Sequence, residues 1–328
     1  MIGNIMKGIS FLFLLFSLFS LNSWATSCTT SNLDVVVLGS GGPEIQLFRS
    51  NPPPQARASA SYLVRENSQA KFLVDLGTGA LQNFAKADAK IEDLKAIFVS
   101  HFHVDHINDL PALLKASFFS DRTDDLPIYG PTGNEVIPDT AQFIARLFGE
   151  NGAYAYLSDF LSGDANYLMK PISVNADKHH PVLFTTEIDG FQIQAIGTEH
   201  GLLPALAWRI EKNGCSVVFS GDTSNKGKTL NQLVKNANWF VAHNAVPESS
   251  QDRVAQKLHM KPSEIGEIAQ QGAVKNVLLS HLMRRTENAK TETKQAIEQR
   301  YKGKIHFAED CAIYALNGAN QTASCKKQ

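Results

Sequence analysis

The sequence predicts a layered α/β protein in which two stacked sheets are covered by helices on their outer faces. In the first half of the chain, short apolar runs typical of strands alternate with helical stretches. From residue 182, four strands follow one another before strands and helices mix again. Two mixed halves of this kind bury their apolar faces by stacking sheet on sheet. A chain of 328 residues with 43% hydrophobic residues is large enough to fill such a core.

The elements expected in the first half are apolar runs bounded by turn residues. The expected strands cover residues 34–38, 59–65, 71–75, 94–99 and 127–129, and the expected helices cover residues 79–87, 107–119 and 135–148. Asn67 and Ser68 mark the turn of a hairpin between the second and third strands. Gly39 to Pro43 is a glycine turn that allows close approach of the backbone to another group. Residues 149–171 are less periodic.

The second half begins with consecutive strands and ends with a mixture. The expected strands cover residues 182–187, 191–198, 205–211, 217–220, 239–242, 276–279, 305–307 and 312–315, and the expected helices cover residues 229–235, 263–271 and 287–301. The ends of these strands matter for function, because strand ends on one edge of a sheet form a converging site.

The N-terminal residues predict a secretory signal peptide. Lys7 precedes an apolar run over residues 9–21, and the small residues Ser23 and Ala25 provide a cleavage site after Ala25. The run is shorter than the roughly 20 apolar residues of a spanning helix, so no stable membrane anchor is expected. We therefore expect a signal peptide over residues 1–25, one hydrolase domain over residues 26–328, and a periplasmic or secreted location.

Export would place the cysteines in an oxidising compartment. Four cysteines allow three disulfide pairings, and the sequence leaves the choice open. A bridge between Cys28 and Cys325 would tie the two mature ends together. Cys215 and Cys311 lie at predicted strands, and two buried free thiols fit this position as well as a bridge does.

The charge balance argues against a polyanionic partner. The formal net charge is -1, with 31 basic and 32 acidic residues. Without a basic excess, no nucleic-acid surface is expected. The predicted partner is a small-molecule ester, and the sequence is compatible with a homo-oligomer.

A histidine-rich turn follows the predicted strand at residues 94–99. His101, His103, Asp105 and His106 place three imidazoles and one carboxylate within six residues. On a tight turn, alternate side chains can converge on one point and their neighbours on another, which suits two adjacent metal ions. Imidazole and carboxylate donors suit zinc or another borderline divalent ion.

Four more titratable residues lie at the ends of predicted strands. Asp75 is placed to orient a ligand imidazole, or alternatively to cap the helix that follows it. His200, Asp222 and His281 each follow a later strand. Taken singly, His200 is also compatible with a core histidine, Asp222 with a helix cap and His281 with a turn residue. Taken together with the histidine-rich turn, they predict one converging site.

This ordered set of residues resembles the ligand set of the metallo-β-lactamase superfamily over nearly all of the mature chain. The resemblance implies an αββα sandwich that binds two zinc ions per chain at one edge of its sheets, and Asp75 matches the first motif of the family. By position in the motifs, the resemblance assigns one ion to His101, His103 and His200, the other ion to Asp105, His106 and His281, and the bridge between them to Asp222.

The later motifs resemble the branch that contains ribonuclease Z, bacterial zinc arylsulfatases and related phosphodiesterases. These motifs are Val241-Ala-His-Asn-Ala245, Leu258-His-Met260 and Ser280-His-Leu282. In ribonuclease Z, a glutamate follows the first histidine and supports a proton-donating histidine that aligns with His259. Asn244 occupies the place of the glutamate, and an amide cannot raise the pKa of a neighbour as a carboxylate can. His243 is expected to support the ligands from behind.

The chain most resembles secreted zinc arylsulfatases, so hydrolysis of aryl sulfate esters to a phenol and sulfate is the expected activity. Two close cations would supply hydroxide near neutrality. Asp105 or Asp222 would hold the hydroxide in line with the atom that it attacks. His259 aligns with the histidine that donates the proton in ribonuclease Z. A phenolate leaves largely unaided, which is compatible with Asn244 in place of the glutamate.

Three alternatives use the same fold. The first is a phosphodiesterase that acts on a cyclic nucleotide or another phosphodiester at the same site. The second is a β-lactamase, which the context of His243 and His259 disfavours. The third is a non-catalytic binding module, which would be expected to lack some of the ligands.

Overall fold

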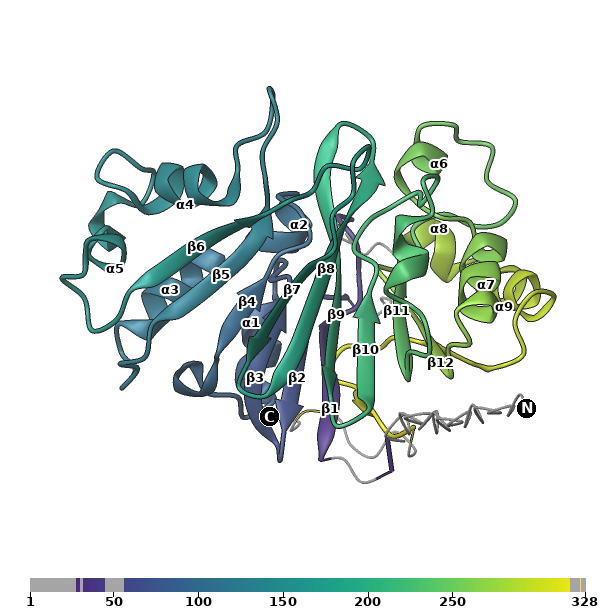
Figure 1. The fold of residues 1–328 in the computed structure, drawn as a ribbon, viewed down its shortest axis with the longest axis horizontal. Coiled ribbons are helices and arrows are strands. Elements are labelled where there is room, and N and C mark those ends of the chain that lie inside the picture. Colours follow the sequence, from purple (N-terminus) through teal and green to yellow (C-terminus); the bar gives the residue numbers. More distant parts are fainter. Residues whose placement is uncertain (1–27, 30–31, 45–55, 319–324, 326–328) are drawn as a thin grey trace, which may run out of the picture.

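The computed structural model describes residues 28–29, 32–44, 56–318 and 325. Within these residues the chain forms two sheets of seven strands each, and helices lie outside them (Figure 1). The predicted fold class, an αββα sandwich, is confirmed.

The first sheet is built from the N-terminal half of the chain and is completed by the last strand. In spatial order it contains β14 (Ile313–Ala315), β1 (Leu33–Gly39), β2 (Ser61–Glu66), β3 (Gln69–Val74), β4 (Ala96–Phe98), β5 (Leu126–Pro131) and β6 (Met169–Val174). Pairing is antiparallel from β14 to β3 and parallel from β3 to β6. The carboxyl ends of β3 and β4 therefore lie at the same edge.

The second sheet is built from the C-terminal half. In spatial order it contains β13 (Lys304–Phe307), β12 (Asn276–Ser280), β11 (Trp239–His243), β10 (Cys215–Phe219), β9 (Leu203–Lys212), β8 (Phe191–His200) and β7 (Phe184–Ile188). β10 to β13 are parallel, and β8 and β10 are both antiparallel to β9. Because of this, β8, β10, β11 and β12 all end at one edge.

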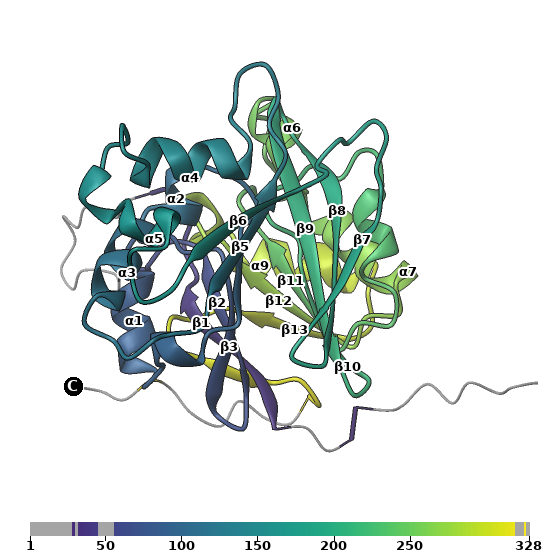
Figure 2. The ribbon, with the colours of Figure 1, turned by 60° about the vertical axis from the view of Figure 1, so that its left-hand side comes forward.

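Helices cover the outer face of each sheet (Figure 2). On the side of the first sheet lie α1 (Ala80–Lys86), α2 (Val104–Ile107), α3 (Leu110–Ser117), α4 (Thr140–Phe148) and α5 (Asp159–Ser162). On the side of the second sheet lie α6 (Ala255–Leu258), α7 (Pro262–Gln271), α8 (Arg284–Glu287) and α9 (Lys290–Glu298). Turns of 3-10 helix lie at Ile91–Asp93, Ala155–Leu157 and Thr229–Gln232.

Three apolar clusters fill the spaces between these four layers. β1 shows how one strand serves two of them, because alternate side chains of a strand point to opposite faces. Val35 and Val37 face the second sheet, whereas Val36 and Leu38 face the helices. A third cluster, which includes Phe240 of β11, lies between the second sheet and its helices. Burial on both faces explains why the strands are continuous apolar runs.

Most expected elements are present, and the hairpin turn is confirmed, with positive φ at Asn67 and Ser68. Several helix boundaries were wrong. The helix expected over residues 107–119 is divided into α2 and α3, and Pro111 lies in the first turn of α3. The helix expected from residue 135 begins at Thr140, because Asp139 caps it by accepting a hydrogen bond from the Gln142 amide at 2.8 Å.

Other elements were predicted with the wrong type or missed. Only Thr229–Gln232 of residues 229–235 is helical, as a 3-10 turn. The helix expected over residues 287–301 is the shorter α9, and the separate helix α8 ends where it was expected to begin. β6 was missed because Pro171 interrupts its apolar pattern. Proline is tolerated there because β6 is an edge strand. The short helix α6 was also missed.

Two disulfides resolve the pairing that the sequence left open. Cys28 is bonded to Cys215 at the start of β10, and Cys311 is bonded to Cys325. A Cys28–Cys325 bridge and a pair of free thiols were therefore wrong. The predicted signal peptide at residues 1–25 lies outside the described residues. None of the helices in the described part of the chain is long and apolar enough to cross a bilayer.

Candidate metal centre

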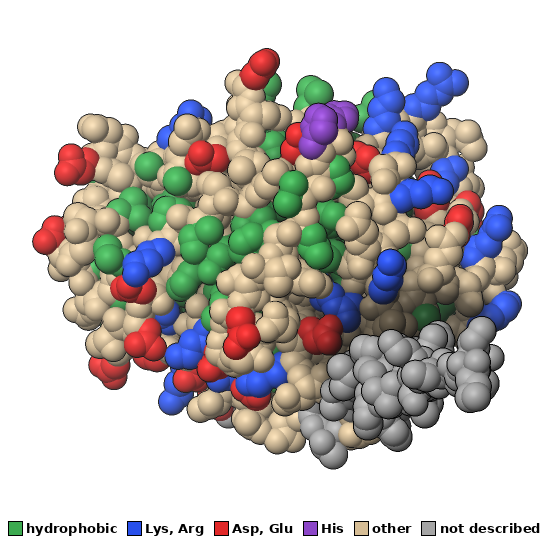
Figure 3. All heavy atoms as spheres, in the orientation of Figure 1, with side chains coloured by type: hydrophobic (Ala, Val, Ile, Leu, Met, Phe, Trp, Pro, Cys, Tyr) green, Lys and Arg blue, Asp and Glu red, His purple; other side chains and the backbone are tan. Residues whose placement is uncertain are grey.

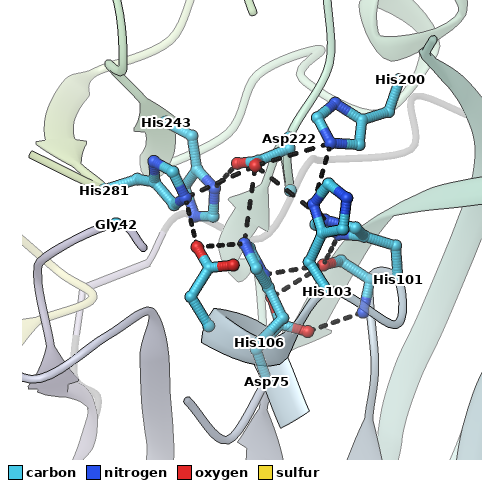
Figure 4. Close-up of polar contacts among 12 residues, drawn as sticks. Gly42, Asp75, His101, His103, His106, His200, Asp222, His243 and His281 are labelled. Atoms are coloured by element: carbon cyan, nitrogen blue, oxygen red, sulfur yellow. Dashed lines mark hydrogen bonds and ion pairs between the residues drawn. The ribbon is translucent and has the colours of Figure 1, made fainter. Parts of the chain in front are cut away.

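The strand ends of both sheets bring the predicted residues together at one edge of the sandwich (Figure 4). Asp75 directly follows β3, His101 and His103 lie in the turn after β4, and Asp105 and His106 lie in α2. His200 ends β8, Asp222 lies in the turn after β10, His243 ends β11, and His281 directly follows β12. The turn after β4 is fixed to the other sheet. The Leu206 amide of β9 donates to the Ser100 carbonyl at 2.9 Å.

Positive backbone φ angles turn the chain at three of these strand ends. The values are 56° at Asp75, 56° at His281 and 57° at Gly221. Glycine adopts this conformation easily, whereas an aspartate or histidine there is strained. Such strain concentrates at functional sites, where the surrounding structure enforces it.

One group of donors has the spacing of ligands around a single ion. His103 Nδ1 lies 2.9 Å from His101 Nε2 and 3.3 Å from His200 Nε2. Asp222 Oδ2 lies 3.9 Å from His101 Nε2 and 3.8 Å from His200 Nε2. Four ligands at 2.0–2.1 Å from a tetrahedral zinc are separated by about 3.3 Å. The group fits one divalent metal ion.

A second group lies beside the first and shares Asp222 with it. Asp105 Oδ2 lies 3.0 Å from His281 Nε2 and 3.5 Å from His106 Nε2. Asp222 Oδ2 lies 3.4 Å from His281 Nε2 and 3.6 Å from His106 Nε2. One carboxylate oxygen therefore faces imidazoles of both groups, which is the position expected for a bridging ligand.

His243 lies close to the second group but supports it from behind. Its donor atoms fall within 4.8 Å of those of His106, Asp222 and His281, so proximity alone would allow it to be a ligand. Both of its ring nitrogens are already engaged by the protein. Nδ1 lies 2.7 Å from Asp222 Oδ1, and Nε2 lies 2.9 Å from the Tyr62 hydroxyl. We therefore place Asp105, and not His243, in the second group.

The protonation states of the donors fit a metal cation. Burial holds the pKa of His101 well below its ordinary value, so this imidazole is neutral. Burial alone would raise the pKa of Asp222, but the imidazoles around it hold that pKa well below the usual range. Neutral imidazoles and ionised carboxylates are the forms that ligate metals.

His106 supplies a second sign that a cation belongs here. Its Nε2 is buried and has no hydrogen-bond partner among the described residues. Burial lowers the pKa of His106, but Asp75 and Asp222 raise it well above the ordinary value. The imidazole therefore carries positive charge between carboxylates, and a divalent cation would replace that charge with release of a proton.

Asp75 contacts both the histidine-rich turn and His106, at the place where the sequence predicts an orienting carboxylate. Its Oδ1 accepts the Ser100 amide at 2.6 Å, and its Oδ2 lies 2.7 Å from His106 Nδ1. The alternative role as a helix cap was wrong, because Gly79 is the N-cap of α1. A carboxylate behind an imidazole fixes its tautomer, so that the other nitrogen can ligate.

Replacing Asp75 with asparagine is expected to weaken metal binding by about 10- to 100-fold. An amide that keeps its oxygen on the Ser100 amide directs its NH₂ group at His106 Nδ1, which favours the tautomer that cannot ligate. Zinc affinity measured by chelator competition tests this. Ser100→Ala keeps the carboxylate and removes only a hydroxyl, which lies 2.8 Å from Asp75 Oδ2 and 3.0 Å from His101 Nδ1, so it should cost less. Equal losses in both variants would contradict the assigned role.

Tyr62 was missed by sequence reasoning because nothing in β2 marks it as a site residue. Its buried hydroxyl crosses from the first sheet to the second, where it contacts His243 and lies 2.7 Å from Ser280 Oγ. The chain Tyr62–His243–Asp222 therefore links the two sheets to the shared carboxylate. Only a three-dimensional structure reveals a contact between strands so far apart in sequence.

The substitution Tyr62→Phe is expected to leave His243 Nε2 buried without a partner. Such an atom costs about 1–3 kcal/mol of stability. Loss of the support for Asp222 should also weaken metal binding by about tenfold or more. Urea denaturation and metal titration measure the two effects. Tyr314→Phe is the matched control, because it removes a hydroxyl whose single hydrogen bond to a described residue is the one to the Phe307 carbonyl at 3.4 Å. A similar loss of metal affinity in the control would refute the role of Tyr62.

His259 lies beside the centre, but its surroundings do not favour an acid. Its Nδ1 is 3.9 Å from Asp222 Oδ1 and makes no hydrogen bond to a described residue. Burial lowers the pKa of His259 to about 3, so the ring is neutral near pH 7. The side chain of Asn244 is also buried and hydrogen-bonds to no described residue. Catalysis by His259 stays a prediction.

The fold and the site define a metal-binding αββα sandwich with donors for a divalent ion at one sheet edge. The family model described as Metallo-beta-lactamase superfamily matches residues 54–268, and the chain belongs to this superfamily. Within it, the chain falls in the ribonuclease Z/phosphodiesterase branch. It is 29% identical over 263 residues to "Ribonuclease Z" of Mycobacterium bovis, a match that covers 76% of this chain and 85% of the relative.

A second relative and a solved structure agree with this placement. The chain is 30% identical over 265 residues to "Ribonuclease Z" of Mycobacterium sp. strain KMS, which covers 76% of this chain and 84% of the relative. It has the same fold as the metallo-beta-lactamase fold protein YhfI from Bacillus subtilis. The TM-score is 0.62 at 21% identity, and the match covers 86% of this chain and 99% of that one.

These relatives correct the predicted activity. The expectation of an arylsulfatase was wrong, because the curated relatives are named as nucleases and fit the phosphodiesterase alternative. The expectation of a small-molecule ester and no nucleic acid as partner conflicts with the same names. A signal peptide and a periplasmic location also conflict with them, and no described residue tests the location.

Proposed function

We propose that the protein is a two-zinc hydrolase of phosphodiesters, with RNA as its substrate class. The observation that carries the proposal is the position of Asp222 Oδ2, which lies within 3.4–3.9 Å of four imidazole nitrogens from both donor groups. A carboxylate shared in this way suits two adjacent divalent ions. When bound, such ions supply a nucleophile at neutral pH and withdraw charge from a phosphoryl oxygen.

The side chains of the protein have distinct parts in this chemistry. Burial keeps the pKa of His101 and of His200 below the ordinary value, so these two imidazoles are neutral donors. Asp75 and His243 fix the orientation of His106 and Asp222. Asp105 and Asp222 are the carboxylates next to the place where water would be deprotonated. They can accept a hydrogen bond from that water and hold it in line with the phosphorus.

An RNA substrate is supported by the relatives and by the charge of the rim. Lys226, Lys228 and Lys257 are exposed, and none forms an ion pair with a residue that the structure describes. Two hydrogen bonds place these lysines near the site. The Gly227 amide donates to Glu199 at 2.6 Å, and the ring of His200 contacts the Leu258 carbonyl at 2.9 Å. Unpaired cations beside such a site attract phosphate groups.

The wider surface agrees with this local charge. In the view of Figure 3, Lys and Arg side chains gather on the right-hand side, where Figure 1 places α6, α7 and α9. The net charge of -1 therefore conceals an uneven distribution, which composition alone did not reveal. A local basic face is sufficient for the electrostatic part of nucleic-acid binding.

Matched rates on three kinds of ester test the proposal. Turnover of bis-nitrophenyl phosphate should exceed that of nitrophenyl sulfate by about tenfold or more, and a chelator should abolish it. Lys226→Glu with Lys228→Glu should lower kcat/KM for a single-stranded RNA while leaving the rate on the small phosphodiester unchanged. Faster sulfate hydrolysis would overturn the phosphodiesterase assignment. Unchanged RNA hydrolysis in the lysine variant, or a cyclic nucleotide preferred over RNA, would overturn the choice of substrate.

A further inference from the structure

His281 differs from the other buried imidazoles of the centre in how its ring is held. In His106 and His200, the nitrogen that points away from the centre meets a carboxylate or a carbonyl at 2.7 Å and 2.9 Å. In His101 it lies 3.0 Å from the Ser100 hydroxyl. The corresponding Nδ1 of His281 is buried and has no hydrogen-bond partner among the described residues. On the side that faces away from the centre, no hydrogen bond to a described residue holds this ring.

The backbone of Gly42 lies directly against the His281 ring (Figure 4). A Cβ atom at position 42 would lie 2.8 Å from His281 Cε1 and 3.0 Å from its Nδ1. The first distance is shorter than real Cβ contacts and the second is shorter than most of them, so a side chain at position 42 would force the His281 ring to shift. On the other side, the ring of His243 stacks on that of His281, with centroids 4.9 Å apart. The imidazole therefore lies between a neighbouring ring and a wall of backbone.

The loop that provides this wall is fixed in place. The Leu282 amide donates to the Ser40 carbonyl at 2.8 Å, which ties the loop to the residue after His281. The hydroxyl of Ser40 donates to Asp310 at 2.6 Å and accepts a hydrogen bond from Arg57 at 2.6 Å. A loop held at both its backbone and its side chains cannot yield easily to an added methyl group. The ring of His281 is the part that would move.

We propose that Gly42 is a positioning residue, which sets the orientation of His281 by contact and so controls metal binding by the second donor group. This inference rests on the proposed metal centre. It assigns a purpose to the glycine turn after β1, which the chemistry of the site leaves without one. Because contact takes the place of a hydrogen bond at Nδ1, the position of His281 depends on the shape of this loop.

The test is Gly42→Ala, with Gly41→Ala as the matched control. A Cβ at position 41 would lie 2.9 Å from Arg57 Cβ, so it crowds the same loop but points away from the ring. The zinc affinity of each variant is measured by chelator competition. In Gly42→Ala, the more weakly bound of the two zinc ions should bind about 10- to 100-fold less tightly than it does in the wild type and in the control. Equal affinity in Gly42→Ala and wild type would overturn the proposal, and so would an equal loss in the control.

A second readout does not depend on metal. The ring signals of His281 in the NMR spectrum of the metal-free protein, identified with a His281→Gln variant, should shift in Gly42→Ala and not in Gly41→Ala. Unchanged signals would refute the positioning role even if the proposed function failed because wild type bound no metal. Should Gly42→Ala not fold, Ser40→Ala loosens the wall without touching the ring. Ser40→Ala should lower the affinity for the same zinc ion to a smaller degree, and an unchanged affinity would count against the proposal.

Discussion

Replacing Asp222 with alanine is expected to abolish shared metal binding and to lower kcat by about 10³-fold or more. The reason is geometric, because one oxygen of this side chain faces imidazoles of both donor groups. Its other oxygen lies 2.7 Å from His243 Nδ1, so the variant also removes the partner of a buried ring. Zinc content by elemental analysis and turnover of bis-nitrophenyl phosphate measure the two losses.

A control is required because a buried carboxylate also affects folding. Asp222→Asn keeps the shape of the side chain but removes its charge, and it should lose metal as well. Asp34→Asn alters a carboxylate that is held by Arg65 at 2.8–2.9 Å near the start of β1, away from the ligands. It should reduce stability yet keep most of the metal. Wild-type zinc content in Asp222→Ala would remove the assignment of the bridging ligand.

The residues of the candidate metal centre could be located from the sequence because each stands at a recognisable place in it. An apolar run followed directly by a histidine or aspartate marks a strand end, and parallel strands end at one edge of a sheet. His200 and His281 were found in this way despite lying far from the histidine-rich turn. The roles that the resemblance assigns to Asp105 and Asp222 agree with the distances between their oxygens and the imidazole nitrogens.

Contacts between the two sheets were not predictable, because no local pattern relates residues that meet only after the sheets stack. Tyr62 has the alternation of an ordinary strand residue, although its hydroxyl contacts His243 and Ser280. Gly42 belongs to the predicted glycine turn, but the side chain that it approaches is that of His281, which lies in the other half of the sequence. The predicted small-molecule partner conflicts with the names of the relatives, and the charge sum gave no sign of the exposed lysines near the site.

The disulfide between Cys28 and Cys215 is expected to contribute more to stability than the one between Cys311 and Cys325. The bonded residues are 187 positions apart in the first bridge and 14 in the second. In the chain-entropy model, the longer loop restricts the unfolded chain by roughly 5 kcal/mol and the shorter loop by about 3 kcal/mol. The double variant Cys28→Ser with Cys215→Ser should therefore lose more free energy of unfolding than Cys311→Ser with Cys325→Ser.

Urea denaturation of the two double variants measures this difference, and the intact mass of the oxidised protein shows whether both bridges form. The longer bridge also has a local effect, because Cys28 and Cys215 are both buried in the core between the sheets. Cys215 begins β10, whose other end leads to Asp222. Loss of this bridge should weaken metal binding less than any ligand variant, since the strand is also paired with β9 and β11. An equal or larger loss of stability from the shorter bridge would show that native packing, and not loop length, determines the contribution of each disulfide.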